Sequence, residues 1–216
     1  MKKLILHSDQ IPENTKIDEK FLSLFDHTPS ITYIPSQSDD SDMTWFRKKE
    51  EYYQNLGVEN LFYFDIDLQY NENKIEEAFL KDAIFLSGGN TFYFLNLLKK
   101  RNIINRIQEY VKNGGVLIGV SAGSILMSPT IQIAKFGDDN EIGIKDLSSL
   151  CLVDFDFYPH YSGDDDPHFS NIIEYSRKFK KVVYVCSDGD GVVIVDDRIT
   201  LFGDVVTINK GKIINK

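Results

Sequence analysis

The 216-residue sequence has only two cysteines and no long hydrophobic run, and each scarcity excludes a class of protein. Cys151 and Cys186 are far apart and lack the spacing of metal ligands, so a disulfide scaffold and a zinc module are excluded. We expect both to be small core residues in a cytoplasmic protein. No apolar run reaches the length of a membrane span, and the short run before His7 predicts a first strand rather than a signal peptide.

The 24 lysine and arginine residues are outnumbered by 33 aspartate and glutamate residues. The formal net charge of −9 argues against nucleic acid and against anionic membrane surfaces as partners. Aromatic residues, in contrast, are plentiful, and Trp45, Phe46, Tyr52 and Tyr53 cluster in one segment. We expect this cluster to belong to the core rather than to an interface between chains.

Short apolar strands alternate with amphipathic helical segments along most of the chain. Strands are predicted at 4–6, 31–34, 61–64, 83–86 and 116–120, and helices at 18–25, 43–56, 74–80 and 90–110, the last broken near 101–102. This alternation predicts one α/β domain, residues 1–216, with helices on both faces of a parallel sheet. Beyond an irregular stretch at 131–150, a strand is expected at 154–158, a helix at 168–179, and an antiparallel tail of strands at 182–186, 192–195, 199–202 and 205–208.

The segment Gly119-Val120-Ser121-Ala122-Gly123 is the most informative motif. It ends a buried apolar strand, and the apolar residues 125–127 then begin a helical face. A G-x-S-x-G sequence between a strand and a helix is a nucleophile elbow, in which glycines permit the sharp turn that exposes the serine. The alternative is an ordinary strand-to-helix turn of a nucleotide-binding α/β protein. We take Ser121 as the candidate nucleophile.

A serine nucleophile needs a base, and the chain offers four histidines. His160 directly follows a predicted strand, and strand ends are where α/β proteins place functional groups. We therefore favour His160, while His168 at a predicted helix start and His7 near the end of the first strand remain alternatives.

The acid that orients the base is predicted after the next strand. Asp188 ends an apolar strand and opens a glycine-rich turn, and Asp190, two residues later, is its competitor. The resulting order is serine, histidine, acid. The serine, acid, histidine order of α/β-hydrolases would require Asp154 and a nearby histidine, which we consider less favourable.

A second glycine pair, Gly88-Gly89, follows the predicted strand at 83–86 and precedes Asn90-Thr91. Its unhindered N–H groups can face the elbow from a neighbouring strand and bind a developing oxyanion. A phosphate-binding turn is the alternative, although the third glycine of G-x-G-x-x-G and the lysine of a P-loop are missing.

Together these motifs resemble the S51 serine peptidases, typified by dipeptidase E. The resemblance extends from the first strand to the tail and rests on 88–92, 119–123, 129–131, Pro159-His160 and Asp188-Gly189. It implies a three-layer α/β sandwich similar to class I glutamine amidotransferases, which is a flavodoxin-like arrangement, with antiparallel strands near the C-terminus.

The resemblance also implies roles. Ser121 would be the nucleophile, His160 the base and Asp188 the acid, at a position where dipeptidase E has a glutamate. Gly88, Gly89 and Ala122 would form the oxyanion hole. The implied activity is hydrolysis of short peptides through an acyl-enzyme by a monomer or small homo-oligomer, without a metal or another cofactor.

One departure concerns the substrate. An arginine near the histidine segment is associated with aspartyl preference, whereas this chain has the acidic stretch 164–166 and Arg177 several positions away. Strict aspartyl specificity is therefore not expected. A non-catalytic binding protein of the same fold and a small-ester hydrolase are the alternative functions.

Overall fold

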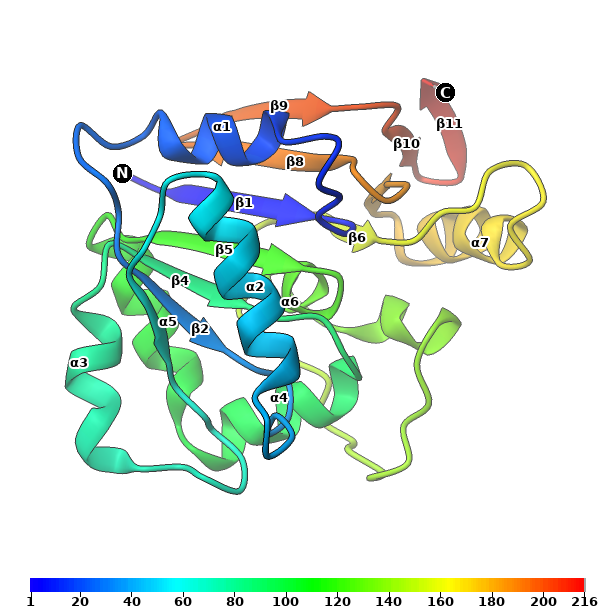
Figure 1. Cartoon of the computed structure of the whole chain (residues 1–216). Coiled ribbons are helices and arrows are strands. Elements are labelled where there is room, and N and C mark those ends of the chain that lie inside the picture. The colour runs from blue at the N-terminus through cyan, green and yellow to red at the C-terminus, as the bar shows by residue number, and fades with distance from the viewer. Residues whose placement is uncertain (216) are drawn as a thin grey trace.

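The computed structural model describes residues 1–215 and contains two β-sheets (Figure 1). The larger sheet has seven strands in the order β3-β2-β4-β5-β1-β8-β9. Its first five strands are parallel: β3 (Leu61–Tyr63), β2 (Ile31–Ile34), β4 (Ala83–Leu86), β5 (Val116–Val120) and β1 (Lys3–His7). The last two, β8 (Gly191–Val195) and β9 (Arg198–Phe202), are antiparallel.

Helices cover both faces of this sheet because its central strands are apolar on both sides. On one face, Ile5 of β1 packs in the same cluster as Phe21 and Tyr53, from α1 (Lys16–Leu22) and α2 (Thr44–Asn55). On the other face, Leu4 and Leu6 belong to the cluster of the remaining helices. These are α3 (Ile75–Phe79), α4 (Thr91–Lys100), α5 (Ile103–Lys112) and α6 (Ala122–Ile125), with the 3-10 turns η1 (Glu72–Lys74) and η2 (Gln132–Phe136). The predicted three-layer α/β arrangement with a mainly parallel sheet is confirmed.

The second sheet has the order β11-β10-β7-β6 and packs against α7 (Phe169–Phe179). It contains β6 (Asp156–Tyr158), β7 (Val182–Val185), β10 (Val206–Asn209) and β11 (Lys212–Asn215). In Figure 1 it lies beside the ends of the parallel strands to which their arrows point. The C-terminal antiparallel strands were predicted, but as one tail. They divide instead between the two sheets, and β6 and β7 pair in parallel. The exposed strand β11 was not predicted, since it has no alternation of buried residues.

Three local expectations were wrong in whole or in part. The elbow helix α6 has only four residues, so the apolar residues 125–127 lie at its end and pack into the core without extending it. Cys151 is exposed, whereas Cys186 is buried, and both are free. Of the aromatic cluster, Tyr53 is fully buried but Trp45 is 64% exposed.

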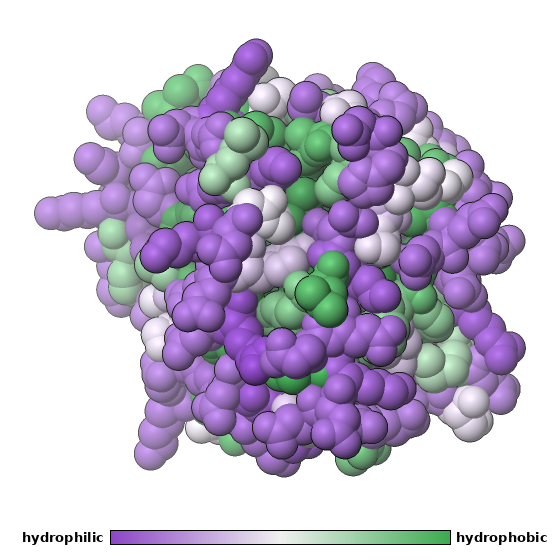
Figure 2. Space-filling model, turned by 90° about the vertical axis from the view of Figure 1, so that its left-hand side faces the viewer, coloured by the Kyte–Doolittle hydropathy of each residue, from purple (hydrophilic) through white to green (hydrophobic). Residues whose placement is uncertain are grey.

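Figure 2 shows one face on which hydrophilic residues predominate and hydrophobic residues form small separated areas. Within residues 1–215, no helix is both long and apolar enough to cross a membrane.

Candidate active site

Ser121 occupies a sharp turn between β5 and α6. Its φ of 52° and ψ of −110° are unusual for a residue with a side chain, and they reflect the strain typical of an elbow. The two glycines are required by close approach rather than by flexibility. A Cβ on Gly119 would lie 2.5 Å from the carbonyl carbon of Gly123, and one on Gly123 would lie 2.2 Å from the Leu86 carbonyl oxygen. The elbow therefore packs tightly against β4, which pairs with β5.

The structure brings the three sequence-predicted side chains into one hydrogen-bonded chain. The Ser121 Oγ lies 2.8 Å from His160 Nε2, and His160 Nδ1 lies 2.7 Å from Asp188 Oδ1. Ser121 follows β5, His160 lies shortly after β6, and Asp188 lies shortly after β7. The side chains of His160 and Asp188 are about half exposed, so the site opens to solvent. Strand ends from both sheets thus meet at one edge.

Ser8 joins this chain, although the sequence analysis did not identify it. Its hydroxyl donates to Asp188 Oδ1 at 3.0 Å and accepts from the His160 backbone N–H at 2.7 Å. Ser8 is fully buried at the end of β1. Its position directly after a strand at the functional edge was the available signal, but many residues share that signal.

The alternative acid, Asp190, faces another part of the molecule. Its carboxylate packs against the turn after β9, where a Cβ on Gly203 would lie 1.7 Å from Asp190 Oδ1. Burial raises the pKa of this carboxyl group, and the nearby Asp188 and Asp204 charges act in the same direction. Asp188, not Asp190, contacts His160.

The alternative histidines also lie away from the serine hydroxyl. His7 is buried, with Nε2 3.6 Å from Asp18 Oδ1, and burial lowers its pKa although Asp18 opposes this. The His168 ring lies against Phe136, with ring centroids 6.2 Å apart, and its backbone N–H donates to Asp166. The fourth histidine, His27, is exposed. Among these four, only His160 is hydrogen-bonded to the Ser121 hydroxyl in the described structure.

The predicted oxyanion residues surround the elbow. A Cβ on Gly88 would lie 3.4 Å from the Ser121 Cβ, and Gly89 has a φ of 131°. The Gly123 N–H donates to the Ser87 carbonyl at 3.2 Å and so joins the elbow to the glycine pair. Ala122 begins α6, and the first N–H groups of a helix have no partner within it.

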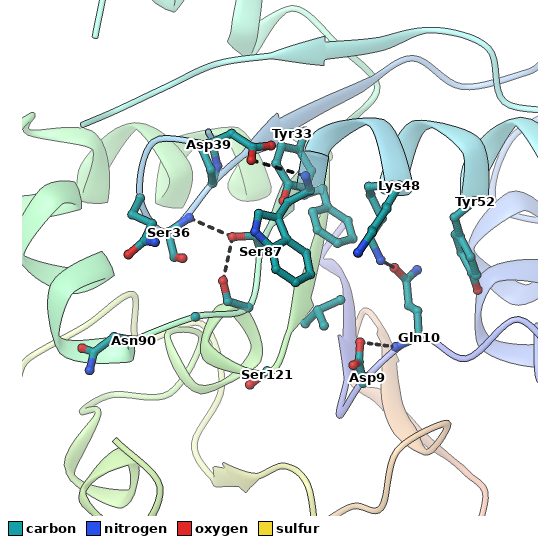
Figure 3. Close-up of a pocket in the computed structure, with 18 of the residues that line it drawn as sticks. Asp9, Gln10, Tyr33, Ser36, Asp39, Lys48, Tyr52, Ser87, Asn90 and Ser121 are labelled. Atoms are coloured by element: carbon teal, nitrogen blue, oxygen red, sulfur yellow. Dashed lines mark hydrogen bonds between the residues drawn. The ribbon is translucent and has the colours of Figure 1, made fainter. Parts of the chain in front are cut away.

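A cavity of about 900 Å³ opens beside Ser121 and His160 (Figure 3). Its walls come from the segments that follow β1, β2 and β4 and from one side of α2. Figure 3 shows Ser121 and Asp9 on one side of this space, with Lys48 and Tyr52 of α2 on the other. The exposed Trp45 also lines it. The size suits a ligand of a few residues rather than a folded protein.

The acidic stretch 164–166 does not line this cavity. Asp166 is buried, and its carboxylate accepts hydrogen bonds from the Tyr158 hydroxyl and the His168 N–H. Arg177 pairs with Glu174 on α7. In residues 1–215, no group of three or more histidine, cysteine or acidic side chains is arranged to hold a metal ion.

A serine, histidine and aspartate linked in this order, next to a cavity and to backbone N–H groups, is the arrangement of serine hydrolases. The comparison with protein families assigns the chain more closely. The family model described as "Peptidase family S51" matches residues 4–202. The chain therefore belongs to that family of serine peptidases.

Individual relatives agree with this membership. An uncharacterized peptidase of Listeria monocytogenes, Lmo0363, is 27% identical over 90% of this chain and 95% of its own. The uncharacterized peptidase PM1590 of Pasteurella multocida is 30% identical, and that match covers 62% of this chain and 65% of the relative. Peptidase E of Nostoc sp. is 29% identical over 81% of this chain and 72% of its own.

Solved structures share the fold. A crystal structure of a Listeria monocytogenes protein described as a peptidase E superposes with a TM-score of 0.76 over 94% of this chain and 98% of that one, at 24% identity. A peptidase from an acI-B1 actinobacterium gives a TM-score of 0.67 over 100% and 97%, at 15% identity. At these identities the similarity shows the fold alone.

Proposed function

We propose that this chain hydrolyses short peptides through an acyl-enzyme formed on Ser121. The observation that carries the proposal is the continuous chain from the Ser121 hydroxyl through His160 to Asp188, with contacts of 2.8 and 2.7 Å. Membership of a serine peptidase family supports the reaction class. The bounded cavity beside the serine supports short substrates.

In the first half of the reaction, the Ser121 oxygen attacks the scissile carbonyl and His160 Nε2 takes its proton. Asp188 holds the proton on His160 Nδ1 and stabilises the imidazolium that forms. The oxyanion is bound by the N–H groups of Gly89 and Ala122, with Gly88 forming the wall behind Ser121. His160 then gives the proton to the leaving amine, and the acyl-enzyme remains.

In the second half, His160 takes a proton from water as the water oxygen attacks the acyl carbon. His160 then returns this proton to the Ser121 oxygen as the ester C–O bond breaks, which releases the carboxylic acid product and regenerates Ser121. The proposed mechanism uses only groups of the chain and water. Like the hypothesis drawn from the sequence, it includes no cofactor. A cytoplasmic location, a single domain over 1–216, and a monomer or small homo-oligomer also remain predictions.

The test is the release of amino acids from a panel of dipeptides and tripeptides by the wild type and by Ser121→Ala. Loss of a triad nucleophile costs about 10⁶-fold in kcat in a known protease, so the variant should show almost no turnover. Substantial cleavage by the variant would refute the role of Ser121. If the wild type cleaves simple acyl esters but no peptide, the protein is an esterase. If it cleaves neither and Ser121 does not react with a phosphonate probe, the protein is a binding protein.

A further inference from the structure

Lys49 of α2 lines the substrate cavity, and its ammonium group forms no direct ion pair in the described structure, although the charges of Asp9 and Asp18 act on it from nearby. Its ammonium group donates to the Gln10 side-chain oxygen at 2.6 Å. Gln10 is a neutral partner, and no acidic side chain of the described residues lies within ion-pair distance of Lys49. The lysine is partly buried, so water compensates its charge only in part.

The contacts of Gln10 hold this arrangement in place. Its amide nitrogen donates to Asp18 Oδ1 at 2.6 Å and to the Tyr53 hydroxyl at 3.1 Å. The Tyr52 hydroxyl donates to the other oxygen of Asp18 at 2.8 Å. Since its nitrogen is used in this buried network, Gln10 turns its oxygen toward Lys49. The buried network therefore fixes the position of the lysine ammonium, and its Asp18 carboxylate attracts the ammonium without contacting it directly.

Two aromatic rings also lie near the ammonium. The Lys49 Nζ lies 5.0 Å from the ring centroid of Tyr52 and 5.3 Å from that of Phe85. These rings attract a cation but carry no net charge. A charge in such surroundings is costly unless it is paired, and its attraction for an anion is stronger than in water. Phe85 lies only three residues before Gly88 in the chain. Lys49, Phe85 and the glycine pair all line the same cavity.

The acidic groups of the cavity wall have partners of their own. The Asp39 carboxylate accepts the backbone N–H groups of Trp45 and Phe46 at the start of α2. Asp40 accepts the N–H of Thr44, and Asp9 accepts that of Gln10. A carboxylate in direct contact with Lys49 is therefore best supplied by a ligand.

We propose that Lys49 binds a carboxylate of the peptide substrate and selects peptides that carry one in reach. The assignment rests on the proposed peptidase function for its role in specificity. Lys49 places a cation of α2 in the cavity wall. Arg177 and the acidic stretch 164–166, which the sequence analysis considered for specificity, do not line the cavity. The bound carboxylate is either an acidic side chain or the C-terminal carboxylate of a short peptide.

The test compares wild type, Lys49→Met and Lys49→Arg on four peptides: Asp-Leu, Asn-Leu and the C-terminal amides of both. A hydrogen bond to a charged group contributes about 1.5–3 kcal/mol, which corresponds to about a 10–100-fold rise in KM for Lys49→Met. The value of kcat should change little, and Lys49→Arg should recover part of the affinity. Lys112→Met, which removes an exposed charge on α5, is the matched control.

The peptides distinguish the two sources of the carboxylate. If Lys49 binds the acidic side chain, the Met variant loses affinity for Asp-Leu and its amide, but not for the Asn peptides. If it binds the C-terminus, both free peptides lose affinity and both amides do not. An equal loss for all four peptides, or no loss for any, would overturn the assignment. Because an unbranched apolar residue of similar length replaces a partly buried lysine, we expect the variant to fold, and its thermal melting is measured in parallel.

Binding measured by calorimetry separates this assignment from the reaction itself. In a Ser121→Ala background, Asp-Leu should bind more weakly when Lys49 is also changed to Met. Lys49-dependent binding together with serine-independent cleavage would refute the mechanism and keep the subsite. Serine-dependent cleavage with binding that ignores Lys49 would refute the subsite and keep the mechanism.

Discussion

Ser8→Ala tests whether the buried serine beside the candidate triad positions two of its members. The substitution removes a hydrogen bond to Asp188 at 3.0 Å and leaves the His160 backbone N–H without its acceptor at 2.7 Å. A hydrogen bond to a charged group contributes about 1.5–3 kcal/mol, and a buried donor left unpaired costs about 1–3 kcal/mol. Because the side chains of Asp188 and His160 are half exposed, the smaller values apply, and we expect a loss of about 2.5 kcal/mol in unfolding free energy.

The catalytic effect should be separable from the loss of stability. If about 1.5–3 kcal/mol of transition-state stabilisation depends on the orientation of Asp188 and His160, kcat should fall by about 10–100-fold. KM should change little, because Ser8 is buried and does not line the cavity. Urea unfolding and steady-state peptide hydrolysis on the same preparation give the two quantities.

Ser176→Ala is the matched control. Ser176 is also fully buried, and its hydroxyl donates to the Lys181 carbonyl and accepts from the Gly211 N–H, so neither contact involves Ser121, His160 or Asp188. It should lose comparable stability with an unchanged kcat. If Ser8→Ala retains the kcat of the wild type while its stability falls as in the control, the positioning role of Ser8 is refuted.

Three further predictions concern the acid, the elbow and the pH dependence. Asp188→Asn should reduce kcat by about 10³–10⁴-fold, as loss of a triad acid does elsewhere, while Asp190→Asn should keep its activity. If steady-state assays show instead that Asp190→Asn loses activity and Asp188→Asn keeps it, the acid is Asp190. Gly123→Ala should cost about 1–3 kcal/mol or more in urea unfolding, since its Cβ would lie 2.2 Å from the Leu86 carbonyl oxygen, and an unchanged midpoint would contradict this packing. Burial lowers the pKa of His7 below 6.5, so the unfolded chain binds the extra proton first as pH falls. Stability should therefore be lost below pH 6.5, by at most about 1.4 kcal/mol per pH unit, and His7→Gln should flatten that slope; equal slopes would show that another group causes it.

Much of the fold follows from local pattern. The parallel strands and their helices were predicted because apolar runs and helical periodicity are encoded over a few neighbouring residues. The second sheet was not predicted, because the choice of partner for a strand near the C-terminus depends on the space left by the elements already packed. The strands around 192–195 and 199–202 look like those at 182–186 and 205–208, yet the first pair extends the large sheet and the second does not.

The candidate site divides in the same way. Gly119, Ser121 and Gly123 could be recognised from sequence because a strained strand-to-helix turn needs that local pattern. His160 and Asp188 could be proposed because each follows a strand. Whether Asp188 or Asp190 faces the histidine could not be decided, since both residues suit the same turn.

The sequence by itself therefore determined the class of fold, the elbow and the short set of candidate catalytic residues, because each depends on residues adjacent in the chain. Only the tertiary structure decided that Ser8 supports Asp188 and His160, and that α2 brings Lys49 to the cavity. Those contacts join residues separated by up to 180 positions. They arise from the crossing of β1, β6 and β7 at one edge and from the packing of α2 against the sheet, which no local pattern specifies.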